Sequence, residues 1–134
     1  MSLDGARSKF ERALKLYEEL GDQWDAGWAL VNLADIAIRR RDEREARRIA
    51  GKALRRFRDI GDRRAFVACR LIHAEGHLLA GEDAQAEALL HDVLAMARRY
   101  GYASKADQAS QSLARVAKAP AKLTERERAG APAP

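Results

Sequence analysis

The feature that most constrains this chain is an internal repeat of 40 residues. Gly21, Gly61 and Gly101 are spaced 40 apart, and each closes a stretch with a helical pattern. Such a repeat is typical of stacked helical units, because one unit alone cannot bury its apolar face. The same spacing aligns small residues with small ones and large with large: Ala34, Ala74 and Ala114; Leu14, Leu54 and Leu94; Tyr17 and Phe57.

Each copy of the repeat divides into two helices. Asp22 and Asp62 directly follow a glycine, so each Gly-Asp pair can end one helix and cap the next. Midway through the first full copy, Asp42 and Glu45 have the spacing of a capping box, in which each side chain bonds to the backbone N–H of the other. These signals place a helix boundary about every 20 residues.

The boundary one period later has Gly81 as the stop and Glu82 or Asp83 as the start of the next helix. We therefore predict an all-α fold of six helices, over residues 4–20, 23–40, 43–60, 63–80, 83–100 and 103–118. Within helix 43–60, an apolar stripe supports this prediction: Ala46, Ile49, Ala50, Ala53, Leu54 and Phe57.

The small and large residues resemble the tetratricopeptide repeat. The first helix of a pair carries Leu33–Ala34 and Ala37, and the second carries alanines at 46, 50 and 53. The next copy departs from the pattern, with His73 and His77 in place of Leu33 and Ala37. The resemblance implies a right-handed α-α superhelix of about three helix pairs. The period of 40 exceeds the family's usual 34 and also admits an armadillo-like stack.

This domain covers residues 4–118, as a partial repeat 4–20, full repeats 22–60 and 62–100, and a partial repeat 102–118. Its long form, with ELGD at a helix end, resembles the helical repeats of LuxR/MalT-like bacterial regulators. Residues 119–134 read as a disordered Ala/Pro-rich charged tail. An alternative is that Leu123, Thr124, Arg126 and Glu127 mark the start of a LuxR-type helix-turn-helix domain whose recognition helix does not follow. That resemblance, with a first helix that lacks a partner before it, implies a fragment of a longer regulator.

No residue pattern predicts catalysis, a cofactor or a metal. His73 and His77 lie four apart, but Glu75 is not where the HExxH motif has its glutamate, and we interpret both as packed or partly exposed structural histidines. Cys69, the single cysteine, reads as a small buried hydrophobe. There is no Gly-rich phosphate loop and no supported nucleophile–base arrangement. We therefore expect a protein that is not an enzyme.

The basic residues favour a different alternative. Residues 39–64 hold twelve Arg or Lys and five Asp or Glu, in a chain of net charge +5. Non-specific nucleic-acid binding through the Arg-rich helix 43–60 is one interpretation. However, the acidic residues are interleaved and no aromatic residue alternates with the arginines, so a solvated face is the preferred interpretation. We expect DNA binding to be weak in the absence of a recognition helix.

The resemblance also implies a binding surface. In tetratricopeptide stacks, residues of the first helices that point away from the second helix of their own pair line a concave groove for a protein or peptide. We expect Trp28 to be the aromatic anchor, with packing against helix 4–20 alone as the alternative. Val31 and Leu71 are the expected apolar shelves, and Trp24 is expected to be a packing residue. The full groove is predicted to contain Trp28, Val31, Asp35, Arg39, Leu71, Glu75, Leu78, Gln108, Gln111 and Arg115.

Two further expectations concern the surroundings of the protein. No run of 18 uncharged apolar residues and no secretory signal is present, so we expect a cytoplasmic protein without a membrane span. Helix 4–20 has more apolar surface than one neighbouring helix can cover, so we expect self-association through it. The residues concerned are Phe10, Leu14, Leu16, Tyr17 and Leu20.

Overall fold

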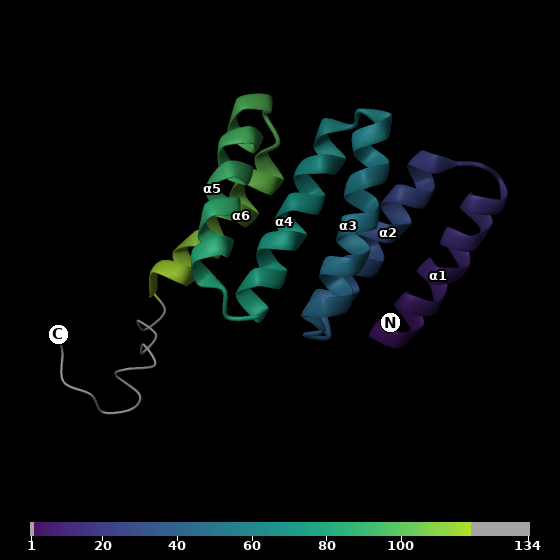
Figure 1. Cartoon of the computed structure of the whole chain (residues 1–134), viewed down its shortest axis with the longest axis horizontal. Helices are drawn as coiled ribbons and strands as arrows, with labels where there is room; N and C mark the ends of the chain where they lie inside the picture. The colour runs from purple at the N-terminus through teal and green to yellow at the C-terminus, as the bar shows by residue number, and fades with distance from the viewer. Residues whose placement is uncertain (1, 119–134) are drawn as a thin grey trace.

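The computed structural model describes residues 2–118, which form six helices and no strand (Figure 1). Every predicted helix is confirmed, and each end lies within one residue of its expected position. The predicted tail, 119–134, lies outside the described residues. The helices are α1 Leu3–Glu19, α2 Gln23–Arg39, α3 Glu43–Ile60, α4 Arg63–Leu79, α5 Asp83–Tyr100 and α6 Ala103–Lys118.

Aspartates cap three of the helices, as predicted. Oδ1 of Asp22, Asp42 and Asp62 accepts a hydrogen bond from the backbone N–H three residues on, at 3.0, 3.2 and 3.0 Å. These bonds satisfy N–H groups that have no partner inside the helix. The reciprocal half of the predicted capping box is absent, because the Glu45 carboxylate pairs with Arg48 instead.

The α5 boundary differs from the others. Glu82 is the N-cap residue, but its side chain makes no capping hydrogen bond. Its carboxylate instead accepts a hydrogen bond from Nη1 of Arg47, on α3, at 3.0 Å. A tertiary ion pair has therefore replaced a local cap, which sequence spacing could not reveal.

Left-handed backbone recurs at every twentieth residue. Gly21, Gly61, Gly81 and Gly101 have φ between 71° and 84°, and Arg41 occupies the same place in the series with φ 61°. A side chain in this conformation costs roughly 1–2 kcal/mol, because its Cβ crowds the following carbonyl oxygen. Arg41 therefore holds strain that the four glycines avoid.

Helix α4 lies at the centre of the core. One cluster of buried side chains joins α2, α3 and α4, and includes Phe57 and Cys69. A second joins α4, α5 and α6, and includes Val67 and Leu90. The predicted stripe of α3 is confirmed: all of its members are buried except Leu54, which is half-buried.

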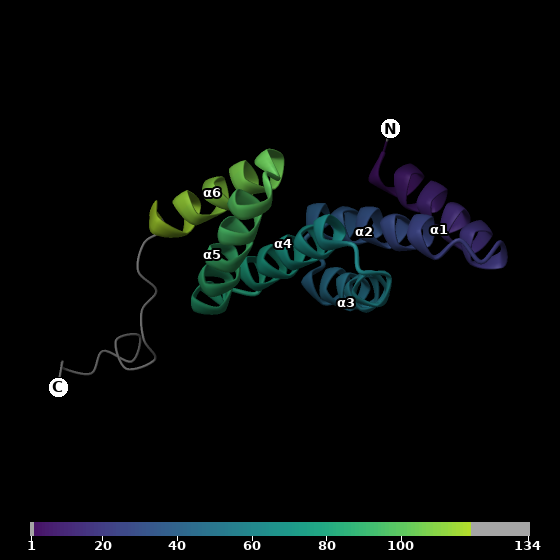
Figure 2. The ribbon, with the colours of Figure 1, turned by 90° about the horizontal axis from the view of Figure 1, so that it is seen from above.

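The helices lie in chain order, from α1 at one end to α5 and α6 at the other (Figure 1). Helix α2 contacts α4, and α4 contacts α6, whereas α1, α3 and α5 contact only helices adjacent to them in the sequence. Viewed at right angles, α3 lies to one side of the row that α2 and α4 form (Figure 2). Helices α2, α4 and α6 thus share a surface to which residues far apart in the sequence contribute.

Candidate functional site

A cavity of about 430 Å³ opens where the C-terminal parts of α2, α4 and α6 meet. We call it the α2–α4–α6 cavity. Four predicted groove residues line it, namely Arg39, Glu75, Leu78 and Arg115. Arg41, with its left-handed backbone, lines it as well. The structure thus brings together charged residues from three helices that span more than 70 positions of the chain.

A polar network connects α4 and α6 at this cavity. Ser112, only 1% exposed, donates a hydrogen bond from its hydroxyl to Oε1 of Glu75. Nη2 of Arg115 donates to Oγ of Ser112 at 2.7 Å and lies 3.2 Å from Oε1 of Glu75. The network holds the Glu75 carboxylate in a defined position, because two donors from α6 bind it.

Three charged residues of this surface occupy one repeat position. Asp35, Glu75 and Arg115 are 40 residues apart, and they lie on α2, α4 and α6. Arg115 pairs with Glu75 across helices, while Asp35 pairs with Arg39 within α2, where Nε lies 3.3 Å from Oδ2. The repeat therefore produces a row of charges of both signs.

Val31 and Leu71 are not the apolar shelves that we expected. They are 8% and 5% exposed and belong to the two core clusters. Gln111, at the same repeat position, is exposed on α6. Val31 and Leu71 are buried because a further repeat follows each of them. Gln111 is exposed because no repeat follows α6 within the described residues. The other predicted glutamine, Gln108, is also exposed, and its side-chain amide donates to Ser104.

The two tryptophans differ in how far they match their predicted roles. Trp28 does not point away from α3, because its ring packs edge-to-face on Phe57, with 5.5 Å between the centroids. It is half-buried, so packing holds most of the ring that we expected to bind a partner. Trp24 packs as expected, edge-to-face on Trp28 with 6.0 Å between the centroids; it is also 49% exposed, and its indole N–H donates to Oδ2 of Asp62 at 2.8 Å.

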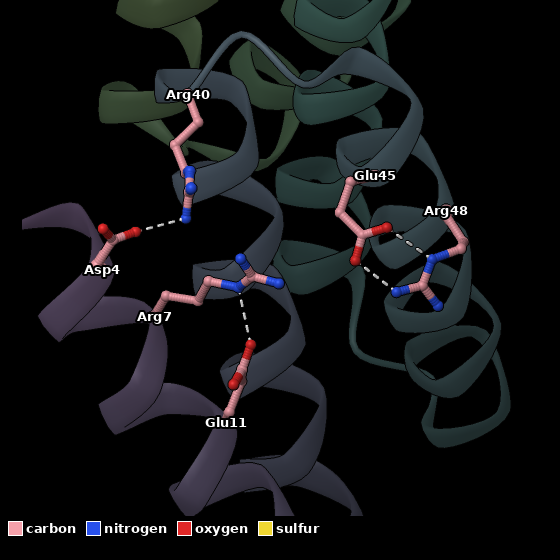
Figure 3. A network of polar contacts seen from close by, with 6 residues as sticks. All are labelled: Asp4, Arg7, Glu11, Arg40, Glu45 and Arg48. Carbon is pink, nitrogen blue, oxygen red and sulfur yellow. Dashed lines mark hydrogen bonds and ion pairs between the residues drawn. The ribbon is translucent and has the colours of Figure 1, made fainter.

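A second hollow, which the sequence analysis missed, lies between α1 and α3 over α2. Two cavities of about 430 and 820 Å³ share Leu14, Leu30 and Lys52 and form one trough. Ion pairs line one end: Asp4 with Arg40, Arg7 with Glu11 and Glu45 with Arg48 (Figure 3).

The equivalent gap between α3 and α5 is filled by polar side chains. Arg47 covers Gly76 of α4, where an added Cβ would lie 2.8 Å from Cγ of Arg47, and it reaches Glu82. The repeat comparison in the sequence shows part of this difference, because four α2 residues and their α4 equivalents differ in polarity or size. They are Leu30, Leu33, Ile36 and Ala37 in α2 and Arg70, His73, Gly76 and His77 in α4.

The two histidines of α4 lie in this filled gap. Burial, followed by the charges of His77, Arg70 and Arg47, lowers the pKa of His73. Nδ1 of His77 lies 3.6 Å from Oε2 of Glu82. Within residues 2–118, no group of three or more His, Cys, Asp or Glu side chains is placed to hold a metal ion.

Cys69 is fully buried, and burial raises the pKa of its thiol to about 12. Because the thiolate is the reactive form, this thiol is inert near neutral pH. None of the helices in the described part of the chain is long and apolar enough to cross a membrane.

No protein-family model matches this chain, and a search of curated proteins finds no significant relative. The resemblance to tetratricopeptide repeats therefore depends on the residues that carry it.

Proposed function

We propose that this protein is an interaction module of the tetratricopeptide type, a right-handed stack that binds a peptide or a partner helix on its α2–α4–α6 surface. The observation that supports the proposal is the α2–α4–α6 cavity. Charged and apolar side chains of α2, α4 and α6 line it, together with Arg41 of the α2–α3 turn and Asp83 at the start of α5. Such a mixture suits partner recognition, because apolar contacts supply affinity and charges define the register.

The charges indicate the chemistry of the partner. Arg39 forms an ion pair with Asp35, and Arg115 forms one with Glu75. Arg41, which also lines the cavity, has no ion-pair partner within residues 2–118. Leu78 and Val116 supply apolar lining beside it. We therefore favour a peptide with an acidic side chain next to one or two apolar ones.

The regulatory role is a finer part of the proposal. The resemblance to LuxR/MalT-like regulators supports a cytoplasmic module that receives a signal within a bacterial transcription factor. Leu123 and Thr124, with Arg126 and Glu127, add to that resemblance but lie outside the described residues. A two-hybrid assay between this chain and the ATPase and DNA-binding domains of such regulators would test this part separately.

Selection from a random peptide library tests the binding surface. We expect the selected peptides to be enriched in Asp or Glu next to Leu, Ile or Phe, and Arg41→Ala and Arg115→Ala to weaken their binding. Arg48→Ala is the matched control, because Arg48 lies on α3 at the edge of the other hollow and pairs with Glu45. If Arg48→Ala alone weakens binding, the α2–α4–α6 surface is not the site.

Non-specific nucleic-acid binding through α3 stays the second candidate. Arg48, Arg47 and Arg56 are each paired with a glutamate. The basic residues of α3 without an ion pair within residues 2–118 are Arg44, Lys52, Arg55 and Arg58. This remaining positive charge is enough for weak phosphate contacts, and a salt titration separates this function from the first.

A further inference from the structure

The core-facing stripe of α1 is covered less than the matching stripes of α3 and α5. Equivalent positions in α3 and α5 are at most 1% exposed, whereas those in α1 are only half-buried. The α1 residues are Ala6, Phe10, Ala13 and Tyr17; their equivalents are Ala46, Ala50, Ala53 and Phe57, then Ala86, Leu90, Val93 and Ala97. Helices α3 and α5 are packed on both sides, and α1 contacts α2 alone.

The uncovered side of α1 has the spacing of a coiled-coil seam. Residues 6, 9, 13, 16 and 20 follow an alternation of three and four, which places them along one side of a helix. Leu16 and Leu20 are 52% and 70% exposed. Four of the five seam residues are apolar; the fifth, Lys9, is exposed, and its long side chain can keep the ammonium group in solvent at the edge of the seam. This side of α1 can therefore pack against another helix.

The flanks of this seam favour a second copy of α1 in the antiparallel direction. Phe10 and Tyr17 lie on one flank, and Arg12 and Glu19 lie on the other, each pair seven residues apart. Arg12 and Glu19 are exposed and form no ion pair within residues 2–118. In an antiparallel pair like flanks meet, so Arg12 of each copy faces Glu19 of the other and Phe10 faces Tyr17. A parallel pair forms neither match.

Head-to-tail stacking of α6 on α1 is the competing arrangement. In each complete helix pair, a small residue packs opposite a larger one. In the α2–α3 pair, Gly27 lies against the ring of Phe57, and the same positions in the α4–α5 pair hold Val67 and Ala97. An α6–α1 pair would instead place Asp107 against Tyr17. This pairing buries a charge without a small partner, so it is disfavoured.

From this geometry we infer that two copies of the protein associate through an antiparallel α1–α1 seam, with Ala13 of each copy packed against Leu16 of the other. This interface is separate from the α2–α4–α6 surface, so it does not depend on the proposed function. Because each copy contributes one helix of 17 residues, the interface is small and the dissociation constant is expected to be micromolar or weaker.

Cysteine cross-linking tests the direction of the pair. In the antiparallel seam, the two residues 13 lie about 5 Å apart along the helix axis, and the two residues 6 lie roughly 25 Å apart. Ala13→Cys should therefore form a disulfide-linked dimer, and Ala6→Cys should not. Ala95→Cys, exposed on α5, is the control for random collision. Buried Cys69 does not react and stays in place.

Charge reversal tests the pairing. Arg12→Glu and Glu19→Arg should each weaken the dimer about tenfold in sedimentation equilibrium, because both cross-helix pairs become repulsive. A mixture of the two variants should recover association as a heterodimer, which a purely structural role for either residue would not produce. Leu16→Glu should give a monomer with unchanged helicity.

Several results would overturn the inference. They are a wild-type monomer at millimolar concentration, equal cross-linking through positions 6 and 13, or no recovery on mixing the charge variants. Growth of long oligomers with concentration would instead indicate head-to-tail stacking. Since none of these measurements involves the peptide-binding surface, either proposal can fail while the other stands.

Discussion

The ring of Phe57 on α3 occupies the space that a β-carbon at position 27 on α2 would need. A Cβ added to Gly27 would lie 2.6 Å from Cζ of Phe57, whose side chain is fully buried. We expect Gly27→Ala to destabilise the protein by about 1–3 kcal/mol, because the ring has no free space to enter. Urea unfolding followed by circular dichroism measures the change.

Gly51→Ala is the matched control for this substitution. Gly51 is also inside a helix, but the nearest atom to its added Cβ is Nη1 of Arg55, at 3.5 Å. We expect this variant to be more stable by roughly 0.5–1 kcal/mol, because alanine favours the helix over glycine. Equal shifts for the two variants would show that Phe57 does not limit position 27.

Two substitutions at left-handed positions should have opposite effects. Gly61→Val should cost about 1–2 kcal/mol, although nothing lies within 4 Å of the added Cβ, because the backbone conformation itself resists a side chain. Arg41→Gly should stabilise by up to about 1 kcal/mol, since relief of strain exceeds the added freedom of the unfolded chain. Urea melts of both variants beside the wild type provide the test. A loss of stability in Arg41→Gly would mean that the Arg41 side chain contributes more than its backbone costs.

Stability should fall on acidification because of His73. Its pKa is lowered in the folded protein by burial and by the charges of His77, Arg70 and Arg47, so the unfolded chain binds this proton more readily. Stability is then full above the unfolded pKa of about 6.5 and decreases as the pH falls from there towards the folded pKa. Comparing urea melts at pH 7.5 and at pH 5.5, roughly one unit either side of that value, should show the loss.

Replacement of the histidines identifies the group responsible. His73→Gln should reduce the difference between the two pH values, and His91→Gln, on the exposed surface of α5, should leave it unchanged. An unaltered difference in His73→Gln would assign the effect to groups other than His73.

Binding to duplex DNA should be weak and should disappear at physiological salt. Glutamates already pair with Arg47, Arg48 and Arg56 on α3, which reduces the positive charge available for phosphates. A gel-shift titration from low to physiological salt measures this. Binding that survives physiological salt, or that selects a sequence, would make nucleic acid the main candidate partner.

Much of the fold was predictable because it depends on local chemistry. Aspartates at 22, 42 and 62 cap helices through contacts three residues away, and glycines end helices through their own backbone freedom. The helical spacing of apolar residues also predicted the buried stripe of α3. The predicted groove was less reliable than the fold. Four of its residues, Arg39, Glu75, Leu78 and Arg115, line one cavity, whereas Val31 and Leu71 are buried.

The remaining features depend on how closely neighbouring helices approach one another. Trp28 packs on Phe57 because Gly27 lets α3 come near, and Glu82 gives up its capping role because Arg47 reaches it from α3. These contacts join residues 29 and 35 positions apart, well beyond the range of helix periodicity. Spacing along the chain therefore determined where the helices begin, end and turn an apolar side inward. Only the packing of three or more helices decided which side chains stay exposed, since that depends on atoms from distant segments that compete for the same space.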